Sequence, residues 1–143
     1  MIGKISRLLS VTLITSGVLG FQILATDVWL RTTAPSHALG LAVFAIFDLI
    51  FAAIVLWKPK FALVGFFLAF VELAAMTADM YVGAPAGVAQ DAFRIYLQSD
   101  SAFSLLLWLQ PVVIGIAIIV FRFRSMTTLD KKLGMSTPVK VSA

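Results

Sequence analysis

Two acidic residues, Asp48 and Glu72, lie near the middle of long apolar stretches, and Gln110 lies at a similar depth in another. Ionisable side chains at the centre of a bilayer are costly, usually face the interior of a helix bundle, and mark candidate functional sites. No lysine or arginine lies within these stretches to neutralise the two acids. We therefore expect a midplane polar cluster of Asp48, Glu72 and Gln110.

Three states of this cluster compete: both acids protonated, one proton shared, or a cation bound between them. Two protonated acids would form hydrogen bonds between helices, which model systems value at about 0.6–2 kcal/mol each. A shared proton or an exchangeable cation is what a coupled transporter requires. The sequence leaves the structural and the functional interpretation open.

A second polar layer, formed by His37, Asp79 and Asp27, is expected near the membrane surface on the side away from the chain termini. His37 precedes Asp48 by eleven residues, or three helical turns, so the two share a helix face. Glu72 and Asp79 are seven residues apart, which separates them by about 10 Å along a helix. Because the other halves of these stretches are apolar, polar access is expected to stop at the midplane.

The supply of metal ligands and nucleophiles is small, because the chain has no cysteine and a single histidine, His37. Thiolate metal sites, iron–sulfur clusters, sites with two imidazoles and standard hydrolytic constellations are therefore excluded within one chain. Imidazole and thioether suit copper, so His37, Met76 and Met80 are weak candidate ligands. We predict no catalytic residues, no metal and no cofactor, with a quinone or copper site beside His37 as an alternative.

The elements that hold these residues follow from composition. Of 143 residues, 61% are hydrophobic and 13% charged, against about 45–50% and 25% in soluble domains. A helix needs about 20 apolar residues to cross a bilayer. Four stretches reach that length, at about 8–28, 37–57, 61–82 and 101–121. We predict an all-α integral membrane protein, a four-transmembrane-helix bundle over residues 1–121 with a basic tail at 122–143.

The connecting segments carry their own signals. Residues 29–36 are expected to form a loop, with Ser36 as the N-cap of the second span. Residues 86–98 place their apolar side chains on one helical face, which predicts a short outer interfacial helix, with a lid or a docking surface as alternatives. Residues 1–25 have the basic start of a signal peptide, but their apolar run is longer than is typical, so cleavage is not expected.

The basic residues are distributed unevenly about the spans. Nine of the eleven lie at the termini or between the second and third spans, and only Arg31 and Arg94 lie on the other side. By the positive-inside rule, both termini of a multi-pass protein in the cell membrane are then cytoplasmic. The basic tail is expected to contact anionic lipid, and no nucleic-acid partner is predicted.

Three functions fit these observations. Small size and one-sided polar access favour a non-catalytic accessory or assembly subunit of a larger integral-membrane complex, respiratory or metabolic, with other membrane subunits or copies of itself as partners. An alternative is a proton- or cation-coupled transporter of a small solute, in which Asp48 and Glu72 change protonation. A second alternative is a membrane redox protein that binds quinone or copper.

Four spans in a short chain with both termini inside resemble the general plan of DoxX-like membrane proteins. The segment Thr128–Leu133 is also similar to the end of some of those chains. This resemblance covers the topology and one short segment, and it implies no role for any residue.

Overall fold

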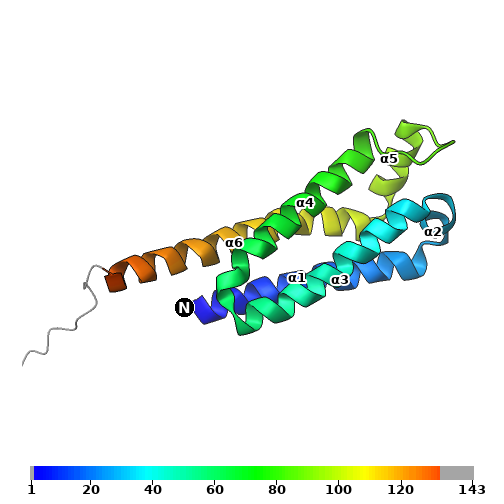
Figure 1. The fold of residues 1–143 in the computed structure, drawn as a ribbon. Coiled ribbons are helices and arrows are strands. Elements are labelled where there is room, and N and C mark those ends of the chain that lie inside the picture. Colours follow the sequence, from blue (N-terminus) through cyan, green and yellow to red (C-terminus); the bar gives the residue numbers. More distant parts are fainter. Residues whose placement is uncertain (1, 133–143) are drawn as a thin grey trace, which may run out of the picture.

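The computed structural model describes residues 2–132, and every regular element in that range is a helix (Figure 1). In chain order the elements are α1 (Ile2–Thr26), α2 (Val28–Thr33), α3 (Pro35–Trp57), the 3-10 turn η1 (Pro59–Phe61), α4 (Ala62–Tyr81), α5 (Gln90–Ser99) and α6 (Ser101–Lys132). The last part of the predicted tail, residues 133–143 with Lys140, lies outside the described residues. The prediction of an all-α chain is confirmed for the described range.

Four helical segments in the described part of the chain are long and apolar enough to cross a membrane. They are Gly3–Thr26, Pro35–Trp57, Pro59–Tyr81 and Ser101–Met126. Their ends agree with the predicted spans to within a few residues, except at the two ends of the chain. α6 in particular remains helical to Lys132, because residues 122–132 contain neither glycine nor proline to end it. The chain thus has the helices of a multi-pass membrane protein.

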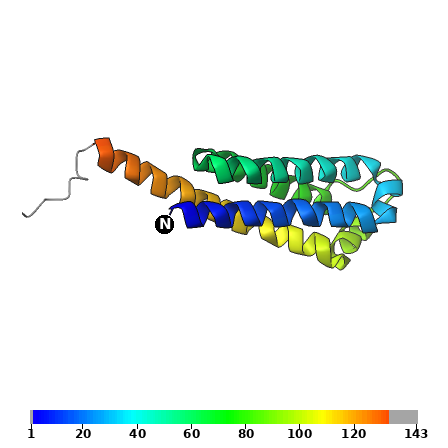
Figure 2. The ribbon, with the colours of Figure 1, turned by 90° about the horizontal axis from the view of Figure 1, so that it is seen from below.

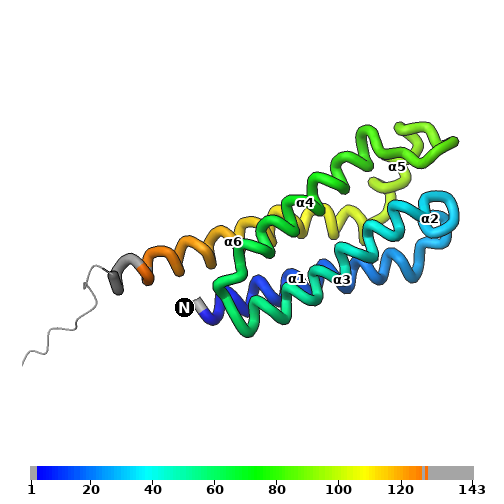
Figure 3. Tube along the Cα trace, viewed as in Figure 1, coloured from blue at the N-terminus to red at the C-terminus, as the bar shows by residue number. Residues whose placement is uncertain are grey.

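The four long helices lie alongside one another, with α1 packed against α3 and α6, and α6 packed against α4. α3 and α4 are joined directly through η1, yet they contact each other much less, and they diverge toward the end that carries α5 (Figures 1 and 3). We name this the α5 end and the opposite one the η1 end. Both the N-terminus and the far end of α6 lie toward the η1 end (Figure 2). The bundle is most loosely packed along the seam between α3 and α4.

The close packing of α1 on α3 depends on two glycines of α1. A Cβ atom on Gly17 would lie 2.8 Å from the backbone oxygen of Ala45, and one on Gly20 would lie 3.0 Å from the Cβ of Ala45. Small residues let membrane helices approach closely where the hydrophobic effect provides little attraction. This contact turns the face of α3 that carries Ala45 and Asp48 into the bundle, where both are buried.

The interior consists of two apolar clusters separated by polar residues. The cluster toward the α5 end includes Ile23, Ala38, Met76, Met80, Phe93, Leu97, Phe103 and Leu106. The cluster toward the η1 end includes Leu9, Leu13, Ala52, Val55, Ala62, Ala69, Val113, Ala117 and Val120. Between them lie the buried polar side chains Ser16, Asp48, Glu72 and Gln110. The polar positions therefore divide the core at mid-height.

The prediction of a loop at residues 29–36 is wrong, because most of this segment forms the helix α2. Asp27 caps that helix, with its Oδ1 accepting a hydrogen bond from the Leu30 N–H at 2.8 Å. The prediction of Ser36 as an N-cap is also wrong, since α3 begins at Pro35 with Ala34 as its N-cap. Proline suits the first helical position, where its fixed φ is helical and its missing N–H is not needed.

Helix α5 closes over the α5 end of the bundle and contacts both α4 and α6. On its inner face Phe93 and Leu97 are buried, whereas Ile95 is 63% exposed. The segment before it is held by Gln90, whose Nε2 donates to the backbone oxygen of Asp79 at 2.8 Å and whose Oε1 accepts from the Ala84 N–H at 2.8 Å. Part of the apolar face predicted for residues 86–98 thus packs on the bundle itself.

Candidate functional site

One polar side chain from each long helix meets in the bundle interior, and we name these four residues the central polar cluster. They are Ser16 of α1, Asp48 of α3, Glu72 of α4 and Gln110 of α6, and each is at most 1% exposed. Ser16 lies beside Asp48, and Asp48 in turn lies near Glu72. The three residues expected at the midplane therefore lie together, with Ser16 as a fourth member.

Hydrogen bonding in the central polar cluster is incomplete. Gln110 Nε2 donates to the hydroxyl of Ser16 at 2.9 Å. Four buried oxygens have no partner among the described residues: both Oδ atoms of Asp48, Oε2 of Glu72 and Oε1 of Gln110. An unpaired buried polar atom typically costs about 1–3 kcal/mol, and an unpaired buried charge costs more. The cluster therefore has more acceptors than donors, which a proton or a cation would balance.

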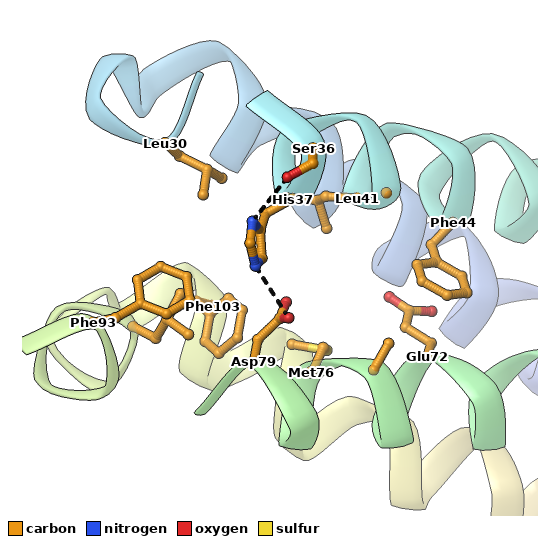
Figure 4. A pocket seen from close by; sticks show the side chains of 13 residues that line it. Leu30, Ser36, His37, Leu41, Phe44, Glu72, Met76, Asp79, Phe93 and Phe103 are labelled. Carbon is orange, nitrogen blue, oxygen red and sulfur yellow. Dashed lines mark hydrogen bonds and ion pairs between the residues drawn. The ribbon is translucent and has the colours of Figure 1, made fainter. Parts of the chain in front are cut away.

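A pocket of about 300 Å³ lies between α3 and α4 on the α5 side of the cluster. Glu72 lies at its inner end, and His37 and Asp79 lie toward the α5 end (Figure 4). Apolar side chains form most of the remaining lining: Leu30, Leu41, Phe44, Ala75, Met76, Phe93, Leu97 and Phe103. Because α3 and α4 diverge here, the pocket extends from the α5 end as far as the buried Glu72.

The imidazole of His37 connects α3 to the end of α4. Its Nε2 lies 2.6 Å from the backbone oxygen of Gly83 and 3.3 Å from Oδ1 of Asp79. Since a carbonyl oxygen can only accept, Nε2 carries the hydrogen in this contact. On the other side of the ring, Nδ1 lies 3.3 Å from the hydroxyl of Ser36 (Figure 4). His37 and Asp79 therefore form a polar pair that spans the seam where the helices are farthest apart.

The hydrogen-bond partners of Asp27 differ from those of His37 and Asp79. Its Oδ1 caps α2, and its Oδ2 accepts a hydrogen bond from the hydroxyl of Tyr96 on α5. The ring of Tyr96 in turn lies 4.3 Å from that of Trp29, centroid to centroid. The outer layer expected from the sequence is thus divided: His37 and Asp79 are at the pocket, and Asp27 joins α2 to α5.

The weak candidate metal ligands Met76 and Met80 are both buried in the apolar cluster at the α5 end. Of the two, Met76 also lines the pocket together with His37 and Asp79. Within residues 2–132, no group of three or more His, Cys, Asp or Glu side chains is placed to hold a metal ion. The polar groups that the pocket offers are two carboxyl groups, one imidazole and one hydroxyl.

Sequence reasoning missed two contributors to the site. Ser16 lies near the middle of α1, and the depth argument that identified Gln110 would also have placed Ser16 in the cluster. Gln90 could not have been found, because its role depends on the path of the loop between α4 and α5. The separation of α3 from α4, which creates the pocket, is likewise a property of packing.

Comparison with known proteins found no matching family model, no matching curated protein and no matching solved structure.

Proposed function

We propose that this chain is a small multi-pass transporter that couples a proton or a cation at the central polar cluster to a small solute in the α3–α4 pocket. The observation that carries this proposal is the set of unpaired oxygens on Asp48 and Glu72. Of these two residues, Glu72 also lines the pocket. A purely structural cluster would be expected to satisfy its own hydrogen bonds. A cluster that exchanges protons or cations needs acceptors that are free in one of its states.

Access from one side is compatible with such a cycle. The pocket leads from the α5 end to Glu72, while the apolar cluster that includes Leu13, Val55 and Val113 fills the core toward the η1 end. A protein that alternates access to a site is closed on one side at any time. Transport then requires a second arrangement in which the η1 half opens, and the sparse contact between α3 and α4 makes these two helices the elements to move.

Difference infrared spectroscopy on the protein in lipid vesicles tests the coupling without knowledge of the solute. We expect the C=O band of protonated carboxyl groups to shrink as the pH rises or as sodium is added, and to be smaller in Glu72→Gln, which keeps only Asp48. The matched control is Asp91→Asn, which removes an acid with an 83% exposed side chain on α5 and should keep the band. A band that stays constant over the pH range in which the protein remains folded would contradict the proposal.

We also infer that both termini are cytoplasmic, that the protein resides in the cell membrane, and that α5 lies at the outer surface. The η1 end carries the basic residues Lys4, Arg7, Lys58 and Lys60, and the positive-inside rule assigns such an end to the cytoplasm. The exposed Ile95, beside the polar Asp91 and Arg94, suits a helix at the membrane–water interface.

A second candidate is the accessory-subunit role expected from the sequence. The open seam between α3 and α4 supports it, because a partner helix could complete the wall that these helices leave incomplete. Purification of the tagged chain from native membranes in mild detergent separates the two functions. Stoichiometric foreign subunits would favour the accessory role, and a pure monomer or homo-oligomer would favour transport by this chain alone.

A further inference from the structure

The charge balance of the α3–α4 pocket is acidic. Its lining contains two carboxyl groups, those of Glu72 and Asp79, and one imidazole, that of His37, but neither lysine nor arginine. Asp48 lies close to Glu72 but is not part of the pocket lining, and its two oxygens have no partner within the described residues. The other members of the central polar cluster, Ser16 and Gln110, are neutral and joined by one hydrogen bond, from Gln110 Nε2 to the Ser16 hydroxyl oxygen. The pocket therefore lacks positive charge at its inner end.

The walls of the same pocket are apolar and partly aromatic. Phe44 of α3 stands beside Glu72, and Phe93 and Phe103 lie at the other end near His37 (Figure 4). Aromatic faces attract a cation within about 6 Å of the ring, more strongly where water is excluded. Apolar walls with a few polar groups are also typical of small-molecule sites, which usually measure about 300–1,000 Å³. At about 300 Å³, this pocket suits a small ligand.

We propose that the α3–α4 pocket binds a small lipophilic organic cation, with its ammonium group at Glu72 and its apolar body against Phe44, Met76 and Phe103. This assignment rests on the proposed transport function and names the class of solute. The cation supplies the charge that Glu72 and Asp48 lack, and its apolar part fills a space that water would occupy poorly. An inorganic cation would use the carboxyl groups but leave the apolar walls without a partner.

Calorimetric titration of the purified full-length chain in detergent tests the assignment with three probes that share a phenyl ring. They are benzyltrimethylammonium, the neutral benzyl alcohol and the anionic benzoate. We expect saturable binding of the cation alone, weakened about tenfold or more in Glu72→Gln. Asp91→Asn removes the same charge from the exposed surface of α5, away from the pocket, and should change the affinity by less than about twofold.

Three results would overturn the assignment: no saturable binding of the cation to the wild type, equal binding to Glu72→Gln, or equal binding of the neutral probe. Tighter binding of a short-chain benzoquinone than of the cation would overturn it as well. If Glu72→Gln does not fold, the variant Ala75→Phe tests the assignment instead, because the phenyl ring fills the pocket and every charge stays in place. Binding to Ala75→Phe must then be lost; unchanged binding would place the cation elsewhere.

The failures of the two proposals are distinguishable. If the ligand class is wrong, the carboxyl band still titrates and benzyltrimethylammonium does not bind. If the coupling is wrong, the cation still binds at Glu72 and the infrared band does not respond to pH or sodium.

Discussion

The side-chain amide of Gln110 in α6 donates to the hydroxyl of Ser16 in α1 at 2.9 Å, in the buried centre of the bundle. This contact joins two helices that are far apart in the sequence and fixes the amide within the central polar cluster. The contact occupies one N–H donor of Gln110, while Gln110 Oε1 and both oxygens of Asp48 have no partners in the described structure. The shortage of donors at this level is the basis of the proposed proton or cation site.

Loss of the Ser16 hydroxyl should weaken the contact between α1 and α6. We expect Ser16→Ala to lower the free energy of unfolding in detergent by about 0.6–2 kcal/mol, the range for hydrogen bonds between membrane helices. Thr15→Ala is the control, because the Thr15 hydroxyl bonds only to the backbone of its own helix, at Val11. Equal stability of Ser16→Ala and Thr15→Ala in thermal unfolding would show that the interhelical bond adds nothing.

Asp48→Asn should change the pH response of the cluster without lowering the stability of the fold. The asparagine amide brings N–H donors into a cluster that is short of them, so the stability should hold or rise by about 1 kcal/mol. The pH response of the carboxyl band should change, because one of its two acids is gone. A stability loss well beyond about 1 kcal/mol, measured by thermal unfolding, would mean instead that the fold requires the Asp48 carboxyl group.

The α1–α3 contact should tolerate no side chain at Gly17. A Cβ there would lie 2.8 Å from the backbone oxygen of Ala45, and that backbone cannot move without shifting α3. We expect Gly17→Ala to destabilise the protein by about 1–3 kcal/mol, as overpacking usually does. Gly115→Ala is the control, since a Cβ at Gly115 meets nothing within 4 Å, and its stability should be unchanged or higher. Similar unfolding temperatures for the two variants would argue against close packing at Gly17.

The chain contains no cysteine, so single introduced cysteines can report which side of the membrane a residue faces. Ser99→Cys, at the exposed end of α5, should react with a membrane-impermeant maleimide on intact cells. Lys58→Cys, at the exposed turn between α3 and η1, should react only after the membrane is permeabilised. The reverse pattern would place the termini outside and invert the proposed direction of access.

Much of the fold could be predicted from the sequence because it depends on local properties. The length and hydropathy of the four spans determine the helices, and depth along each helix placed Asp48, Glu72 and Gln110 at one level. The helix α2 was missed because the cap at Asp27 was not recognised, and the N-cap at Ser36 was wrong because Pro35 begins the helix one residue earlier.

The arrangement of the site depends on packing between helices that are distant in the sequence. The short turn η1 joins α3 directly to α4, but the glycines of α1 allow α3 to pack closely on α1, and the seam between α3 and α4 is left open. For the same reason, nothing local indicated that Asp27 would bind Tyr96 rather than join His37 and Asp79.

Uptake of labelled benzyltrimethylammonium by lipid vesicles that contain the purified chain tests the central claim most directly. We predict that wild-type vesicles accumulate the cation when their interior is acidic, since protons leaving the central polar cluster are exchanged for it. Accumulation should be retained in Asp91→Asn and lost in Glu72→Gln. Uptake that is independent of the pH gradient, or equal in wild-type and Glu72→Gln vesicles, would contradict coupled transport at this cluster.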